Sequence, residues 1–147
     1  MDEKKTAKYI SSVPKSERSW PRIEGAKYTG RTEDRLYLDS KILEGCPVFV
    51  EIYWITEIPD PNPGVFSHTH EYDQLLIYMG ADPKNSDDLG AELEIELEGE
   101  KHIINKTSAI YIPKGMKHCP ITHKRVDRPY RVVTVAFSGG YEYTLAK

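Results

Sequence analysis

GVFSHTHEYDQLLIYMG, residues 64–80, is the stretch that decides the fold of this chain. It carries His68, His70 and Gln74 at positions of one parity, and side chains along a β-strand alternate between faces with a period of two. These three side chains therefore point the same way if the strand is unbulged. A second stretch, TSAIYIPKGMKHC, residues 107–119, ends in His118 after a turn signalled by Pro113 and Gly115. The two segments together offer three imidazoles and one side-chain carbonyl, enough donors for one metal ion.

The two segments resemble the paired motifs of the cupin superfamily. The first motif is glycine, a short spacer, His-x-His, three or four residues, a carboxylate and glycine; the second is Pro-x-Gly-x-x-His. The matching residues are Gly64, His68, His70, Gly80, Pro113, Gly115 and His118. The wider resemblance covers roughly residues 22–138, and it implies an all-β chain folded as a double-stranded β-helix, the jelly-roll barrel of cupins.

The resemblance also implies a ligand set for one divalent transition metal ion. We expect Fe first, with Zn, Mn or Ni as alternatives, held by His68, His70, Gln74 and His118. Glutamine stands where the family usually has glutamate, so its oxygen can coordinate but brings no negative charge. The ion would be a stronger Lewis acid and be held less tightly. Of the neighbouring carboxylates, Asp73 has the opposite parity and Glu71 would need a bulge to reach the site.

Short segments rich in β-branched and aromatic residues predict about nine or ten strands and no long amphipathic helix. We expect strands at residues 36–39, 47–58, 74–79, 91–98, 102–105, 108–112, 117–123 and 130–137, with a polar loop at 81–90. In Pro47–Ile58 the even positions form the more apolar face, whereas Glu51 and Glu57 suggest that the odd face is partly wet. Residues 91–98 alternate apolar and glutamate side chains, which is typical of a half-buried strand.

Length and composition favour a single globular domain. The chain has 147 residues, 39% hydrophobic and 29% charged, with a net charge of −3, so we expect no nucleic-acid partner. No apolar run approaches the ~18 residues of a transmembrane helix, and the charged N-terminus lacks the apolar core of a signal peptide. Two cysteines are too few for a disulfide scaffold, so we expect a cytoplasmic protein. We assign residues 1–21 to an N-terminal arm and residues 22–147 to one cupin barrel domain.

Other residues near the motifs receive weaker assignments. By parity with Gln74, Leu76 and Tyr78 are candidates for a substrate pocket, and Trp54 is a further candidate. In a regular strand Cys119, next to His118, faces away from the metal. His102 and His123 are expected to be surface or packing histidines. No serine or cysteine has the context of a catalytic triad, and no acid–base residue can be assigned from the sequence.

Three functions remain open. Three histidines and one oxygen ligand leave about two open positions on an octahedral ion. Family resemblance therefore favours a dioxygenase-like enzyme that acts on a small oxygenated organic acid chelated to the metal. The first alternative is a redox-neutral metal-dependent isomerase or lyase, which the neutral Gln74 favours slightly. The second is a non-catalytic module that binds a small ligand, because fold alone does not give function. In each case we expect a small-molecule ligand and a homodimer, with Pro47–Ile58 and the N-terminal arm as candidate interfaces.

Overall fold

The computed structural model describes residues 4–12, 14–15, 21, 23–32, 35–140 and 142–146. Within these ranges the chain is nearly all β. One short 3-10 helix, η1 (Ala7–Tyr9), precedes the strands β1 (Pro14–Lys15), β2 (Thr29–Arg31), β3 (Arg35–Leu38), β4 (Phe49–Asp60), β5 (His68–Thr69), β6 (Gln74–Met79), β7 (Asp88–Leu97), β8 (Glu100–Lys106), β9 (Ser108–Ile112), β10 (His118–Val126), β11 (Tyr130–Ala136) and β12 (Thr144–Leu145).

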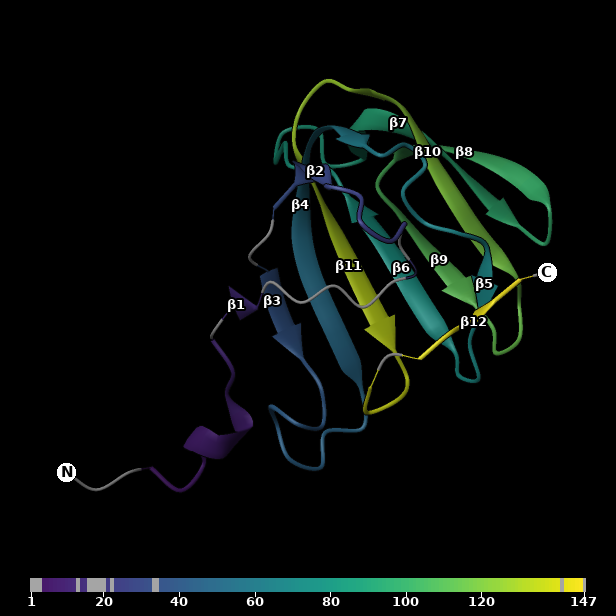
Figure 1. Ribbon diagram of the computed structural model, residues 1–147. Helices are drawn as coiled ribbons and strands as arrows, with labels where there is room; N and C mark the ends of the chain where they lie inside the picture. The colour runs from purple at the N-terminus through teal and green to yellow at the C-terminus, as the bar shows by residue number, and fades with distance from the viewer. Residues whose placement is uncertain are drawn as a thin grey trace.

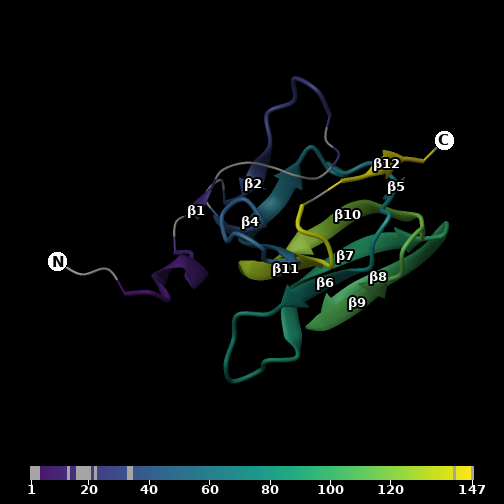
Figure 2. The ribbon, with the colours of Figure 1, turned by 90° about the horizontal axis from the view of Figure 1, so that it is seen from below.

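The strands form two antiparallel sheets that enclose the core (Figures 1 and 2). The larger sheet has the order β1-β3-β4-β11-β6-β9, with β2 also paired to β4, and the smaller sheet has the order β12-β5-β10-β7-β8. Neighbours in the sheets are often far apart in sequence, as in the pairing of β4 with β11. This arrangement confirms the expected all-β jelly-roll barrel.

The core lies between the two sheets, and along much of each long strand buried side chains alternate with more exposed ones. Strand β7 contributes Ala91, Leu93 and Ile95, all essentially inaccessible, while Glu92 and Glu94 between them stay partly exposed. The predicted alternation is therefore confirmed. β7 begins at Asp88, inside the stretch expected to be a loop, because Asp88 already pairs with Lys106 of β8. The backbone of residue 80 approaches this start closely. A Cβ on Gly80 would lie 2.0 Å from the Asp88 carbonyl oxygen, so only glycine fits.

The two faces of β4 are arranged opposite to the prediction. The odd positions Phe49, Glu51 and Ile55 are buried, and Tyr53 lines the interior with them. The even positions, which the sequence suggested as the inner face, point away from the barrel interior. Both faces of this strand are rich in apolar residues, so hydrophobicity alone did not identify the inner one.

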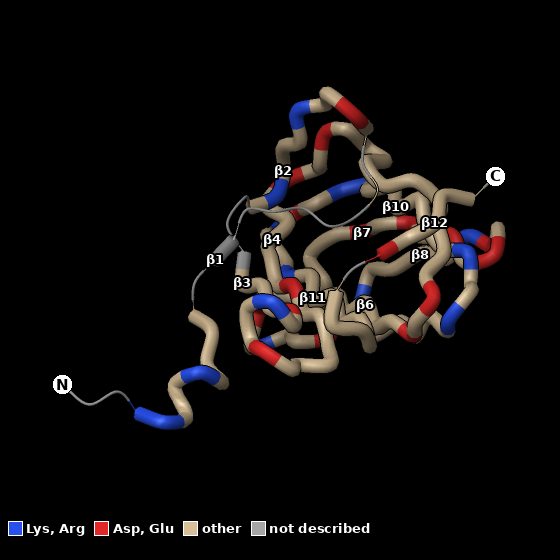
Figure 3. Tube along the Cα trace, turned by 60° about the horizontal axis from the view of Figure 1, so that its bottom comes forward, with Lys and Arg blue, Asp and Glu red and all other residues tan. Residues whose placement is uncertain are grey.

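The short helix η1 and most of the described charged residues lie outside the core, whereas Asp39 and Glu51 are buried. β1 pairs with β3 through Pro14 and Leu36, and Figure 1 shows η1 set apart from the barrel. The division at residue 21 stays a prediction. Acidic and basic positions are interspersed around the barrel (Figure 3). Among the described residues, no helix is long and apolar enough to cross a membrane.

Replacing Leu93 with alanine tests the packing of the core. Leu93 is fully buried among the apolar side chains of both sheets, and truncation there leaves a cavity. We expect the free energy of unfolding to fall by about 3 kcal/mol, measured by urea denaturation. The matched control is Ile103→Ala, because Ile103 is 51% exposed on β8. Equal losses in the two variants would contradict this core.

Candidate metal centre

Two strands of the smaller sheet bring the first and second histidine motifs together. His68 begins β5 and His118 begins β10, and the two are direct partners in the antiparallel pairing of these strands. His70 follows β5 directly, and Gln74 begins β6 in the facing sheet. All four side chains are buried, at 2–3% exposure.

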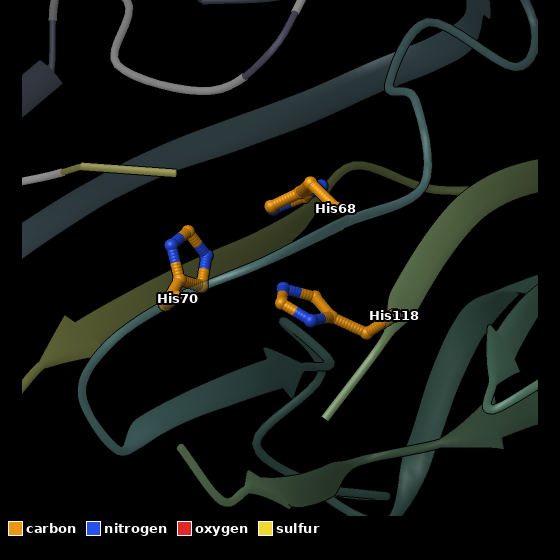
Figure 4. Close-up of side chains that lie close together, drawn as sticks. All are labelled: His68, His70 and His118. Atoms are coloured by element: carbon orange, nitrogen blue, oxygen red, sulfur yellow. The ribbon is translucent and has the colours of Figure 1, made fainter. Parts of the chain in front are cut away.

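The three histidine rings point toward one another (Figure 4). Their ring centroids are separated by 4.2 Å for His68 and His118, 4.8 Å for His68 and His70, and 5.0 Å for His70 and His118. One ring nitrogen of each histidine lies within 4.8 Å of the corresponding nitrogens of the other two. The three histidines therefore lie close enough together to hold one metal ion.

Backbone carbonyls fix the orientation and the tautomer of each ring. The Nδ1 atom of His68 lies 2.7 Å from the carbonyl oxygen of Phe66, and that of His118 lies 3.0 Å from the carbonyl oxygen of Met116. Nδ1 of His70 bonds in the same way to the carbonyl oxygen of Glu142. A carbonyl oxygen only accepts, so each Nδ1 carries the proton. Each neutral ring is thus left with an Nε2 lone pair that can coordinate a metal, and such second partners are typical of metal-ligating histidines.

Burial keeps the three rings neutral. Burial and, less strongly, the neighbouring His118 together lower the pKa of His68 to about 3. Burial also lowers the pKa of His118 to about 4 and that of His70 below its ordinary value. Because metal coordination requires the neutral imidazole, the cluster is in its binding form at neutral pH.

The turn before His118 has the predicted geometry and is tied to the first motif. Gly115 has φ +82°, a conformation that glycine adopts without strain, and its N–H donates to the carbonyl oxygen of His70 at 2.9 Å. The carboxylate of Asp73 accepts from the N–H of Lys114 at 2.8 Å. Asp73 therefore holds the turn in place, and it does not join the histidine cluster.

The side chain of Gln74 completes a group of donors that fits a metal ion. It lines the same cavity as His68 and His118. Its Oε1 atom is buried without a hydrogen-bond partner, although buried acceptors are nearly always satisfied. A cation among the histidine nitrogens would satisfy it. The residues present therefore fit a divalent metal with imidazole and oxygen ligands.

The cavity beside the cluster includes two of the three pocket residues expected from the sequence. Leu76 and Tyr78 line it, together with His68, Gln74 and His118. Trp54 does not, and that assignment is corrected. It belongs to the outward face of β4, where the guanidinium carbon of Arg131 lies 4.7 Å from its ring centroid.

Sequence reasoning missed an acidic residue in this cavity. Glu51 is 2% exposed and lines the cavity beside Tyr53 and Thr134. It is the single acidic residue among the described residues of the lining. Its register partner on β11 is Thr134, which places both on the inner face of the larger sheet. The available signal was a glutamate at the parity of Phe49 and Ile55, in the mainly apolar first part of the strand.

Two further expectations concern β10. Cys119 does not face away from the cluster: it lines the same cavity, because it has φ 71° and the register with β7 shifts between His118 and Ile121. The strand is not regular there, so parity fails. His123 is a buried packing histidine bonded to the hydroxyl of Tyr130, and His102 is an exposed residue 3.7 Å from Glu100.

The C-terminal segment closes one side of the cluster. β12 pairs with β5 through Leu145 and His68. The carbonyl oxygen of Glu142 accepts hydrogen bonds from His70 and from the hydroxyl of Tyr72, the latter at 2.8 Å. The ring centroid of Tyr143 lies 6.0 Å from that of His68. This segment therefore helps to orient His70. The contact between His70 and Glu142 cannot be predicted from a local sequence pattern.

Comparisons with known proteins find solved structures of similar fold but no matching sequence family. No protein-family model and no curated protein sequence matches the chain. Among solved structures, the polyketide cyclase RemF from Streptomyces resistomycificus is similar with a TM-score of 0.56 and 12% identity, over 100% of this chain and 86% of that one. A cupin 2 domain-containing protein from Halorhodospira halophila has a TM-score of 0.54 and 16% identity, over 92% and 83%. An oxalate oxidase in complex with glycolate has a TM-score of 0.51 and 14% identity, over 80% of this chain, which spans only 55% of the oxidase. At these identities the likeness concerns the fold alone.

His70→Ala tests the cluster without disturbing the β5–β10 pairing. Because His70 follows β5 rather than pairing within it, we expect the barrel to stay folded and to lose most of its bound metal. Elemental analysis of the purified variants measures this loss, and circular dichroism reports the fold. His102→Ala is the matched control, because His102 is exposed and distant in the fold. Unchanged metal content in His70→Ala would show that the site is elsewhere.

The metal-free protein should lose stability as the pH falls below about 6.5, the ordinary histidine value. His68, His118 and His123 have folded pKa values of about 3, 4 and 4, so the unfolded chain takes up protons that the folded chain does not. The free energy of unfolding should therefore decrease from pH 7 to pH 4. Urea denaturation with a chelator present measures it. A flat profile over this range would contradict three buried neutral histidines.

Proposed function

Because the chain has the cupin fold, we propose that it is a mononuclear metal-binding protein that holds one divalent transition metal through His68, His70, Gln74 and His118. The observation that carries this proposal is the convergence of the three histidine side chains beside the buried, unsatisfied Oε1 of Gln74. Imidazole and amide oxygen suit Fe, Zn, Ni and Mn, and we expect Fe.

We further propose that the chain is an enzyme acting on a small oxygenated organic acid in a dioxygenase-like reaction. The similar oxalate oxidase holds glycolate, which provides a precedent for a ligand of this kind on the fold. A bound ion would supply Lewis acidity and, if it were iron, redox chemistry with O₂. The cavity beside the cluster is walled by Tyr53, Leu76 and Val132. These side chains give the cavity a mainly apolar wall, next to which electrostatic interactions are stronger than in water.

Glu51 is our candidate for proton transfer in this cavity. Its carboxylate is buried in the larger sheet and lines the same cavity as His68 and His118 of the smaller sheet, whereas the four proposed ligands are all neutral. A carboxylate in this position can accept a proton from a ligand hydroxyl and return it later. It also offsets part of the positive charge that the neutral ligand set leaves in the cavity.

Two alternatives remain, and one has an observation in its favour. The neutral Gln74 makes the bound ion a better Lewis acid and a poorer reductant, which favours a redox-neutral isomerase or lyase. A non-catalytic module that binds a small ligand uses the same cavity without turnover. Dependence of turnover on oxygen distinguishes the dioxygenase-like enzyme from the isomerase or lyase. Any turnover distinguishes both enzymes from the binding module.

The enzymatic proposal is tested by turnover of a panel of small hydroxy and oxo acids with and without O₂. We expect metal-dependent O₂ consumption, and at least about 10-fold slower turnover in Glu51→Gln with unchanged metal content. Glu100→Gln is the control, since Glu100 is 81% exposed. Turnover that persists without O₂ would favour the isomerase or lyase. Tight binding without turnover would favour the binding module.

A homodimer is our proposal for the assembled state, and the outer face of the larger sheet supports it. Direct register partners share a face of a sheet, and two rows of partners cross five strands. The first row contains Leu36, Ile52, Val133, Ile77 and Ala109; the second contains Leu38, Val50, Val135, Leu75 and Tyr111. All ten are apolar or aromatic, and Leu36 and Tyr111 are 37% and 56% exposed. An apolar surface of this extent is typical of an interface.

The remaining partner and compartment assignments are also proposals. We propose a cytoplasmic protein, because both cysteines, Cys46 and Cys119, are free thiols and a reducing compartment keeps them so. We propose a small-molecule ligand as the partner and no nucleic acid. The interspersed charges of Figure 3 support the second point, because nucleic-acid binding surfaces concentrate basic residues.

Ile52→Lys tests the dimer. Ile52 lies in the first apolar row between Leu36 and Val133, so a buried charge there should destabilise the interface and leave a monomer. Light scattering at micromolar concentration should report a dimer for the unmodified chain and a monomer for the variant. Ile103→Lys, at an exposed position on β8, should remain dimeric. A monomeric unmodified chain would contradict the proposal.

A further inference from the structure

His70 differs from the other two histidines of the cluster in what holds its ring. His68 and His118 begin paired strands, and the carbonyl oxygens that accept from their Nδ1 atoms lie two residues earlier in the chain. His70 follows the end of β5, and the carbonyl oxygen that accepts from its Nδ1 belongs to Glu142, 72 positions away. The orientation of His70 therefore depends on where a distant backbone segment lies.

That segment is the C-terminal strap, residues 142–146. Its second half is attached to β5: β12 pairs with β5, and the N–H of Ala146 donates to the carbonyl oxygen of Ser67 at 3.0 Å. Figure 2 shows β12 beside β5. Tyr143 and Leu145 are 45% and 51% exposed, so apolar burial contributes little to holding the strap. Specific hydrogen bonds must then fix its position.

The hydroxyl of Tyr72 holds the first residue of the strap by both of its backbone groups. It donates to the carbonyl oxygen of Glu142 at 2.8 Å and accepts from the N–H of Glu142 at 3.0 Å. A carbonyl oxygen has two lone pairs, so the same oxygen can accept from Tyr72 and from Nδ1 of His70 at once. The two bonds to Tyr72 set the position of that oxygen beside the imidazole ring.

The ring of Tyr72 also contacts His70 directly. The two rings are stacked, with centroids 4.8 Å apart and planes inclined by 16°. Stacking limits the tilt of the imidazole, while the hydroxyl fixes the acceptor for its Nδ1 proton. One side chain thus constrains His70 in two ways, through the face of its ring and through its Nδ1 hydrogen bond.

We propose that Tyr72 is a positioning residue for His70: by holding the backbone of Glu142, it keeps the His70 proton on Nδ1 and leaves the Nε2 lone pair directed at the other two histidines. The proposal rests on the proposed function only in taking His70 as a metal ligand. Partners that orient a ligating histidine typically change metal affinity about 10- to 100-fold. The strap therefore contributes to metal binding without supplying a ligand.

The first test is the tautomer of His70 in chelator-treated, 15N-labelled protein, read from the imidazole nitrogen chemical shifts at neutral pH. His70→Ala identifies the signals of this ring. Tyr72→Phe keeps the stacked ring and removes the hydroxyl, so the Nε2–H form of His70 should appear beside the Nδ1–H form. His68 should keep its Nδ1–H form, because its acceptor carbonyl belongs to Phe66.

The second test is zinc affinity, measured by competition with a chromophoric chelator. Tyr72→Phe should raise the dissociation constant for Zn²⁺ at least about 10-fold. Tyr72→Leu, which also removes the stacking, should raise it further. Tyr9→Phe is the matched control, because Tyr9 is 65% exposed on η1, and it should change neither the tautomer nor the affinity. Circular dichroism reports whether each variant is folded.

A His70 ring that stays wholly in the Nδ1–H form in Tyr72→Phe would overturn the proposal. Equal changes at His68 and His118 would also overturn it, because they indicate a general loosening of the site. So would a zinc affinity in Tyr72→Phe equal to that of Tyr9→Phe. A tautomer change confined to His70 in a chain that binds no metal would sustain this proposal and defeat the proposed function.

Discussion

The antiparallel pairing of His68 with His118 is the contact on which the proposed centre depends. It joins β5 to β10 and so aligns two motifs fifty residues apart in the chain. The pairing places their rings 4.2 Å apart between centroids. Three backbone carbonyls then fix each proton on Nδ1 and leave the Nε2 atoms to converge. Buried neutral imidazoles in this arrangement are able to hold a metal ion without first losing a proton.

The charged side chains of the interior have defined positions relative to the histidine cluster. The proposed ligands are neutral, so a divalent ion would bring its charge into the barrel uncompensated by Gln74. Glu51 lies on the wall of the same cavity, and Arg31 lines a second cavity that shares Tyr53 and Tyr78 with the first. The interior is thus polarised along its length, with an acidic group beside the cluster and a basic group at the far end.

Local sequence patterns predict most of the fold and the histidine cluster. They fail at positions whose orientation depends on contacts between distant parts of the chain. The alternation of Ala91, Leu93 and Ile95 and the shared parity of His68 and His70 are local, so both could be predicted. The inner face of β4 could not be predicted, because both of its faces are rich in apolar residues. The sequence therefore does not show that Trp54 points outward and Glu51 inward. Cys119 points into the cavity because its φ is positive and because the register of β10 with β7 shifts beside it. The carbonyl of Glu142 reaches His70 across 72 positions of sequence, a contact that no local pattern contains.

The most direct test of this account is elemental analysis of the chain purified without oxygen and without added metal. The account predicts about one equivalent of a transition metal per chain, with iron foremost, and its loss from a His68/His118 double variant that remains folded. Less than about a tenth of an equivalent after reconstitution, at a pH where the histidines are neutral, would contradict it. The barrel would then be a metal-free binding protein, and its interior polarity would need another explanation.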